Sequence, residues 1–308
     1  DLFTIPGFFH LSVKEGHLYG SLIDIVNRAA PLMLAAIGMT LVIATRGIDI
    51  SVGAVVALSG TMAAMLVGGG PEAEHSLTYA FGAAMGAALL CGLWNGILVA
   101  GLGLQPIVAT LILMVAGRGL AQLLTDGQII TVYYEPFFKL GGGYFAGLPF
   151  SLTVVAVLFA LVAFMMRRTA LGLFIQAVGI NPVAARLAGL KTATLIMFVY
   201  IFCSACAGLA GLMVSSNIKS ADANNAGLLL ELDAILAVTL GGTSLAGGKF
   251  SLVGSVIGAL IIQTLTYTIY SLGVPPEVNM VVKSIVVFLV CLSQSDEFKK
   301  LFARKNAA

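Results

Sequence analysis

The stretch Arg167–Lys191 reads RRTALGLFIQAVGINPVAARLAGLK, and the rest of the chain is organised around it. Asn181 followed by Pro182 predicts a helix start, because Asn caps free backbone N–H groups and Pro fits the first helical position. Val183–Ala188 then predicts a short helix of small residues, which Gly189 ends. The stretch also gathers four cations between two long apolar segments: Arg167, Arg168, Arg186 and Lys191.

Two interpretations of this basic stretch stay open. A short helix with small side chains, held at a membrane surface, suits docking to another protein. Basic loops are also common in membrane proteins, where they do no more than fix the topology.

The composition defines the class of protein. The chain has 308 residues, of which 59% are hydrophobic and only 10% are charged. A soluble domain carries about 25% charged residues, so this chain has too little polar surface to coat a water-soluble globule. We therefore expect an all-α polytopic membrane protein.

Apolar segments recur along the whole chain, and a full membrane span needs about 20 such residues. The candidate spans are Ala29–Thr45, Val52–Val67, Leu77–Leu102, Gln105–Thr125, Pro149–Met166, Ala193–Ser215, Leu252–Leu272 and Val278–Leu292. One further apolar stretch, Leu232–Leu240, is too short to span alone. It predicts a broken or half-inserted helix within the segment 231–245.

The basic residues predict an orientation. Both the basic stretch and the tail Lys299–Lys305 should face the cytoplasm. Four crossings then separate them if the short segment crosses. Counting backwards puts the residues before Asp24 outside, so we expect one more helix before Asp1, about ten spans in the intact chain, and a cytoplasmic C-terminus.

Glycine pairs at four-residue spacing predict close approach of helix backbones. They are Gly82 and Gly86, Gly92 and Gly96, and Gly254 and Gly258. Cys203 and Cys206 have the spacing of half a zinc or redox site, but no second ligand pair accompanies them. We interpret them as small buried helix residues.

Charged residues within apolar segments are better pointers to function, since a charge at the bilayer centre costs roughly 2.5–3.5 kcal/mol on insertion scales. Arg118 lies well inside the fourth span, and Glu231 and Asp233 open the short segment. We expect Arg118 to pair with Asp233 or Glu231. The pair would be either a static ion pair or part of a moving gate.

Uncharged hydrogen-bonding groups also lie near the spans. A polyhydroxylated solute needs such groups together with aromatic faces, and the candidates are Asn95, Gln122, Asn224, Asn225 and the neighbouring Trp94. Helix packing and anchoring at the membrane interface are the alternative roles of Asn and Trp.

Several chemistries are missing from the sequence. Gly241–Lys249 approaches a phosphate-binding loop, but Thr243 stands where its first Gly belongs and Phe250 where its hydroxyl belongs. No zinc, haem or nucleophile–base spacing is present, nor a series of mid-membrane carboxylates. A transporter of this composition must borrow its source of energy.

Four sequence blocks carry a resemblance that extends over nearly the whole chain. They are GIDISVG at 47–53, QPIVAT at 105–110 with GRG at 117–119, AVGIN at 177–181 with AARLAG at 184–189, and ELDAI at 231–235 with GGTSL at 241–245. Together they resemble the permease subunits of ribose-type bacterial ABC sugar importers. ADANNAG at 221–227 and NRAAP at 27–31 are most similar to galactofuranose-importer permeases. Many relatives carry a basic residue near position 173, where this chain has Leu173.

The resemblance implies a single permease domain over residues 1–308, with 167–191 as a cytoplasmic coupling element. A separate ATPase subunit, which would bind ATP and magnesium, would dock there, and this chain would need no cofactor and catalyse no reaction. The coupling residues would be Asn181, Ala184, Ala185, Arg186 and Gly189. The pathway or gate would draw on Asp49, Trp94, Asn95, Arg118, Gln122, Asn224, Asn225, Glu231 and Asp233.

The same resemblance implies the surroundings of the chain: the bacterial inner membrane, a second permease subunit, a periplasmic sugar-binding protein, a sugar substrate and no nucleic acid. Two alternatives remain, a self-sufficient sugar carrier or facilitator and a membrane scaffold without transport activity.

Overall fold

The computed structural model describes residues 12–14, 17–145, 147–273 and 275–294, and its elements are almost all helices. The longer ones are α1 (Ser21–Ala44), α2 (Val52–Val67), α3 (Leu77–Gly96), α4 (Pro106–Leu124), α6 (Phe150–Arg168), α9 (Thr192–Ile218), α10 (Leu230–Leu240), α11 (Leu252–Ser271) and α12 (Pro276–Gln294). A π-helical turn, η1 (Ile97–Gly101), extends α3. The prediction of an all-α polytopic protein is confirmed.

Shorter elements lie at the two ends of the bundle. The short helices are α5 (Glu135–Gly142), α7 (Leu171–Ile180) and α8 (Pro182–Leu187). Three antiparallel strand pairs are formed by β1 (Ser12–Lys14) with β2 (His17–Tyr19), β3 (Ile130–Thr131) with β6 (Ser220–Ala221), and β4 (Tyr144–Phe145) with β5 (Leu148–Pro149).

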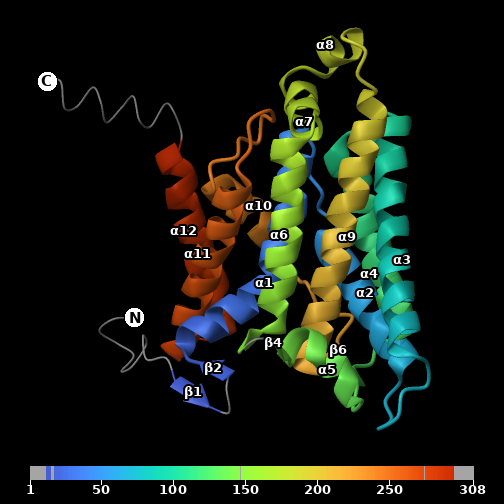
Figure 1. The fold of residues 1–308 in the computed structure, drawn as a ribbon, viewed down its shortest axis with the longest axis vertical. Coiled ribbons are helices and arrows are strands. Elements are labelled where there is room, and N and C mark those ends of the chain that lie inside the picture. The colour runs from blue at the N-terminus through green and yellow to red at the C-terminus, as the bar shows by residue number, and fades with distance from the viewer. Residues whose placement is uncertain (1–11, 15–16, 146, 274, 295–308) are drawn as a thin grey trace, which may run out of the picture.

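Figure 1 shows that α7 and α8 lie at one end of the bundle and α5 with the strands at the other. We call these the α8 end and the α5 end. After α8 the chain runs down α9, back along α10, down α11 and back along α12 toward the α8 end. The four helices thus alternate in direction, and of these α9 and α11 are long and apolar enough to cross a membrane. The tail Lys299–Lys305 and a helix before Asp1 lie outside the described residues.

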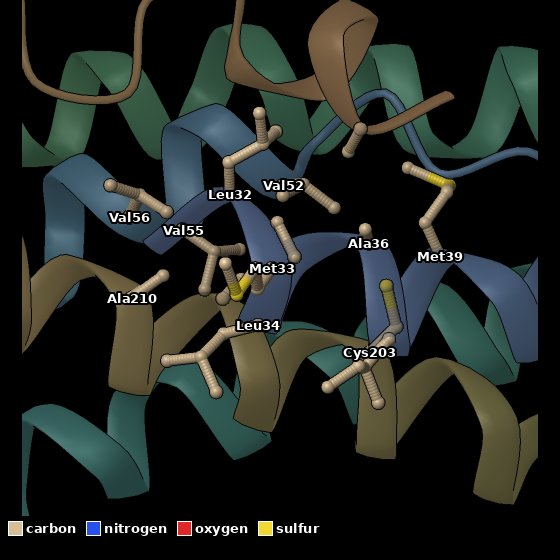
Figure 2. Packing of buried hydrophobic residues seen from close by; sticks show 14 of the residues in the cluster. Leu32, Met33, Leu34, Ala36, Met39, Val52, Val55, Val56, Cys203 and Ala210 are labelled. Atoms are coloured by element: carbon tan, nitrogen blue, oxygen red, sulfur yellow. The ribbon is translucent and has the colours of Figure 1, made fainter. Parts of the chain in front are cut away.

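Helix α1 is the centre of the bundle. From Leu32 to Ala44 every residue is buried, because α1 is apolar on all sides and packs against α9, α11, α10 and α6. Figure 2 shows Leu32, Met33 and Leu34 among side chains of α2 and α9. Helices in lipid associate through such van der Waals packing, so this three-helix core fixes the positions of the others.

Helix length distinguishes the helices that can cross a membrane from those that are too short. In the described part of the chain, six helices are long and apolar enough to cross a membrane: α1, α3 with η1, α4, α6, α9 and α11. Helix α2 has only 16 residues and α10 only 11, or about 17 Å at the usual rise. The prediction of a short or broken segment within 231–245 is therefore confirmed.

Two of the three glycine pairs allow close helix approach. A Cβ built on Gly92 would lie 2.6 Å from the Cα of Ile201 in α9, and one on Gly258 would lie 2.1 Å from the carbonyl oxygen of Ala237 in α10. The prediction for Gly82 and Gly86 is wrong within this chain. A Cβ on either would meet nothing within 4 Å, since their side of α3 faces away from the bundle.

The structure adds helices where loops were expected. The first half of the basic stretch forms α7, because its apolar run LGLFIQAVGI at 171–180 buries one side against the bundle. Helix α5 interrupts the polar segment between α4 and α6, with Phe137 fully buried. Cys91, Cys203 and Cys206 are free and buried, as the packing interpretation expects.

Candidate functional site

Helix α8 is held at both ends by the residues that predicted it. The Asn181 side chain accepts hydrogen bonds from the backbone N–H groups of Val183 and Ala184, each at 3.0 Å. At the other end, Gly189 adopts φ +89° and donates to the carbonyl of Arg186 at 3.0 Å, while Leu190 donates to that of Ala185 at 3.1 Å. These two backbone hydrogen bonds form a Schellman motif, which favours glycine at the position of Gly189.

The α7–α8 segment is also tied to the bundle. The Arg46 guanidinium donates to the carbonyl of Ile180 at 2.5 Å, and the N–H of Gly248 donates to the carbonyl of Ala44 at 2.9 Å. These two bonds join the end of α1 to the last residue of α7 and to the loop before α11.

The exposed side of α8 differs from the expected one. Leu187 is 86% exposed, and Val183 and Ala184 are also exposed. Ala185 is only 5% exposed, so placing it at the surface of a docked partner is wrong. On a six-residue helix seated on α7 and α9, one position must face inward, and Ala185 fills it.

Toward the α5 end, the segment 219–229, which we call the outer loop, folds around Arg118. The Nη1 atom of Arg118 donates to the backbone carbonyls of Ala223 at 3.1 Å and Ala226 at 2.6 Å. The expected ion pair of Arg118 with Asp233 or Glu231 is therefore wrong. The carbonyls of a tight turn satisfy the guanidinium instead, and sequence cannot reveal such backbone acceptors.

Three of the other candidates meet in the same loop. The side-chain amide of Gln122 donates to Asn224 at 2.8 Å, and that of Asn225 donates to Asp222 at 2.7 Å. Burial raises the pKa of the Asp222 carboxyl, but hydrogen bonds from the Asn225 side chain and from the backbone N–H groups of Asn224 and Asn225 outweigh it. The pKa therefore lies below its ordinary value. Asn224 and Asn225 are exposed, so they can meet a solute that approaches this end.

Glu231 lies where the outer loop meets the start of α2. A Cβ on Gly53 would lie 2.2 Å from Oε2 of Glu231 and 2.2 Å from the carbonyl oxygen of Gly227, so only glycine allows this approach. Oε2 is buried and accepts no hydrogen bond in the structure. A carboxylate beside the first turn of a helix is favourable, because the helix dipole is positive there.

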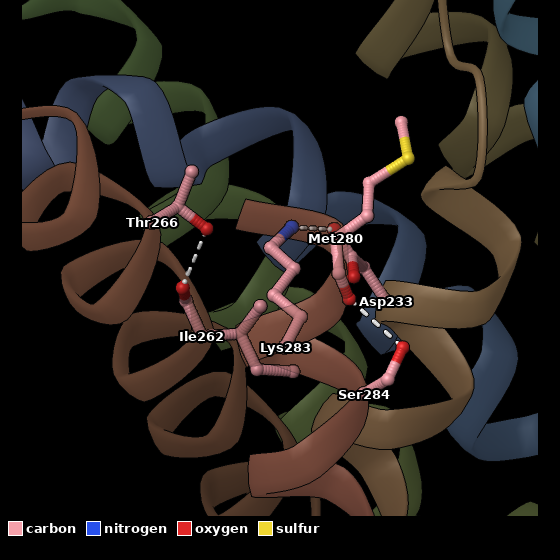
Figure 3. A network of polar contacts seen from close by, with 6 residues as sticks. All are labelled: Asp233, Ile262, Thr266, Met280, Lys283 and Ser284. Carbon is pink, nitrogen blue, oxygen red and sulfur yellow. Dashed lines mark hydrogen bonds and ion pairs between the residues drawn. The ribbon is translucent and has the colours of Figure 1, made fainter. Parts of the chain in front are cut away.

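Asp233 has a partner that the sequence analysis missed. The Nζ atom of Lys283 in α12 lies 2.7 Å from Oδ2 of Asp233 in α10, as Figure 3 shows. It is the one ion pair in the described part of the chain. Lys283 is the single charge within the apolar run 278–292, and this was the signal that could have identified it.

Asp49 and Asn95 form a buried polar cluster with Ser51. The carboxylate of Asp49 accepts from the backbone N–H and the hydroxyl of Ser51 at 2.9 and 2.6 Å. The Asn95 amide donates to Ser51 Oγ at 2.9 Å and to Asp49 at 3.4 Å. Trp94 is instead 50% exposed, so its side chain lies outside this buried cluster. The cluster braces the α1–α2 connection against α3.

No group of three or more His, Cys, Asp or Glu side chains that could hold a metal occurs among the described residues. The chain is a multi-pass membrane protein with a short, capped helix at one end and a polar, hydrogen-bonded loop toward the other. It belongs to the family described as branched-chain amino acid transport system / permease component, whose model matches residues 21–291.

Sequences of curated relatives are similar to this one over nearly its whole length. The galactofuranose transporter permease protein of Escherichia coli is 52% identical over 302 residues, which cover 98% of this chain and 87% of the relative. The fructose import permease protein of Bifidobacterium longum is 40% identical, covering 96% and 83% of the two chains. The ribose import permease protein of Escherichia coli is 37% identical, covering 93% and 87%. No solved structure matches the chain.

Proposed function

We propose that this chain is the permease subunit of an ATP-binding-cassette importer and forms the pathway for a monosaccharide, galactofuranose or a related sugar. The 52% identity to a galactofuranose transporter permease over 98% of the chain supports this sugar class. The observation that carries the mechanism is α8, a helix capped at both ends that presents an apolar side chain to solvent.

Charge sets the orientation that we propose. The α8 end carries six cations: Arg46, Arg167, Arg168, Arg186, Lys191 and Lys249. The α5 end, with the strands and the start of α1, carries four cations, Lys14, Arg28, Lys139 and Lys219, which are outnumbered by six acids: Asp24, Glu72, Glu74, Asp126, Glu135 and Asp222. By the positive-inside rule, the α8 end faces the cytoplasm of the bacterial inner membrane, and the C-terminus lies on the same side.

A cytoplasmic ATPase subunit docks on α8 and the residues around it. Leu187, Val183 and Ala184 offer it an apolar contact, and Arg186 and Gly189 lie at its edge. ATP and magnesium are bound by that partner, and this chain catalyses no reaction. Because α8 is tied to α1 through Arg46, ATP-driven movement of the partner shifts the bundle between outward and inward access.

A periplasmic binding protein delivers the sugar at the α5 end. The exposed amides of Asn224 and Asn225 provide hydrogen-bonding groups there, and Arg118 and Gln122 hold them in place. A second permease subunit, a copy or a related chain, completes the pathway.

Reconstitution into proteoliposomes tests this function against its alternatives. We expect uptake of radiolabelled galactofuranose only when the ATPase subunit, the binding protein and ATP are all present. Uptake by this chain alone would identify a self-sufficient carrier. No uptake under any condition, despite correct assembly, would favour a scaffold.

A further inference from the structure

A cavity of about 330 Å³ lies beside α8 and has no part in the transport mechanism described above. It is bounded by the last turns of α6, by α7 and by the residues that open α11. The cavity lies between α6 and α11, which each pack against α1.

Six of the nine residues that line this cavity are apolar. Phe159, Ala163 and Met166 line it from α6, and Phe250 closes it from the α11 side. From Phe159 to Arg167 the lining follows α6 for about 12 Å at the usual rise, which is a sizeable part of one leaflet. Only 17% of the apolar window of α6 is buried within the chain, so an acyl chain can reach this helix from the side.

The mouth of the cavity is polar and positive. Arg167 is the single charged residue of the lining, and the amide of Gln176 lies there as well. Arg167 makes no hydrogen bond or ion pair in the described part of the chain, and its side chain is exposed. An uncompensated guanidinium above an apolar slot has the chemistry that recognises phosphate, because its fork of donors matches phosphate oxygens.

We propose that this cavity binds an anionic phospholipid of the leaflet that meets the α8 end. The headgroup phosphate contacts Arg167 and Gln176, and an acyl chain lies along Phe159, Ala163 and Met166. A soluble anion would leave the apolar wall uncovered. A zwitterionic lipid offers Arg167 a phosphate whose charge its own ammonium group already balances. Basic pockets between membrane helices are the general form of anionic lipid sites.

Native mass spectrometry on the purified, delipidated chain tests the proposal without the ATPase or any transport. The probe is phosphatidylglycerol, compared with phosphatidylcholine and with inorganic phosphate. We expect Arg167→Gln to weaken binding of the first phosphatidylglycerol about tenfold, the effect of losing one charge-assisted contact. Arg168→Gln is the matched control, because it removes the same charge one residue away and outside the lining.

Filling the apolar part provides a second test that leaves the charge in place. Ala163→Phe should also weaken phosphatidylglycerol binding, and circular dichroism should show an unchanged helix content. Equal losses in the Arg167 and Arg168 variants would overturn the proposal. So would equal binding of phosphatidylcholine, full competition by inorganic phosphate, or undiminished binding to a folded Ala163→Phe variant.

Discussion

Lys283 Nζ lies 2.7 Å from Asp233 Oδ2, and this contact joins α12, the last described helix, to the 11-residue helix α10. The two side chains are 22% and 20% exposed, so the pair is largely removed from solvent. Helix α10 has only 11 residues and starts next to the outer loop. The ion pair therefore fixes α12 to the element that links the outer loop to the α8 end.

Breaking this pair should destabilise the bundle. We expect Asp233→Asn or Lys283→Gln alone to lower the free energy of unfolding by about 2 kcal/mol, because each leaves one charge uncompensated. This value lies between those for surface and for buried ion pairs. The double variant should cost no more than either single variant. Thermal unfolding in detergent measures all three, and simply additive losses would show that the two residues are not coupled.

Leu187 should matter more for coupling than any other residue of α8. Leu187→Asp places a charge in the apolar contact with the ATPase, so sugar import should fall about tenfold or more. The purified variant should keep its thermal stability, since Leu187 is 86% exposed in this chain. Leu173→Asp is the matched control, because Leu173 is 68% exposed but lies on α7. Equal import by the wild type and Leu187→Asp would remove α8 from the docking surface.

The cap of α8 offers a separate test. Asn181→Ala removes the acceptor for two backbone N–H groups and should cost about 1 kcal/mol locally, whereas Asn181→Asp retains an acceptor. Hydrogen exchange at the amides of Val183 and Ala184 reports the local loss. We expect faster exchange and weaker import for the Ala variant, with the Asp variant near wild type. Unchanged exchange in Asn181→Ala would argue against the cap.

Arg118 should hold the outer loop closed rather than move as a charged gate. Arg118→Met removes two hydrogen bonds to backbone carbonyls and should cost about 2 kcal/mol of local stability. Hydrogen exchange should quicken at residues 222–226 and stay unchanged in α8. Gln122→Ala should have a smaller effect, because the Gln122 side chain donates one hydrogen bond, to the exposed side chain of Asn224, and none to the backbone of the turn.

Features that depend on a few neighbouring residues could be predicted from the sequence. Contacts between residues far apart in the sequence could not. Asn181, Pro182 and Gly189 specify α8 through backbone capping, which acts within a few residues. Asp233 and Lys283 are 50 residues apart, and only the packing of α10 and α12 brings them together. The carbonyls that satisfy Arg118 belong to a turn whose shape the sequence does not specify.

The sequence also could not show which side of the short helix α8 is buried. Six residues of small side chains carry too little periodicity to tell the inward position from the outward ones, so Ala185 was assigned to the surface. Helix α7 was missed for a related reason. Its apolar run is too short to span a membrane, and the arginines before it are typical of a loop.

The central claim is that α8 faces the cytoplasm and receives a separate ATPase subunit. The most direct test is labelling of Leu187→Cys by a membrane-impermeant maleimide, with background from the four native cysteines subtracted. We predict labelling only in inverted membrane vesicles, and protection when the ATPase subunit is assembled. Labelling of intact, cell-wall-free cells from the outside, or full reactivity in the assembled complex, would contradict the account.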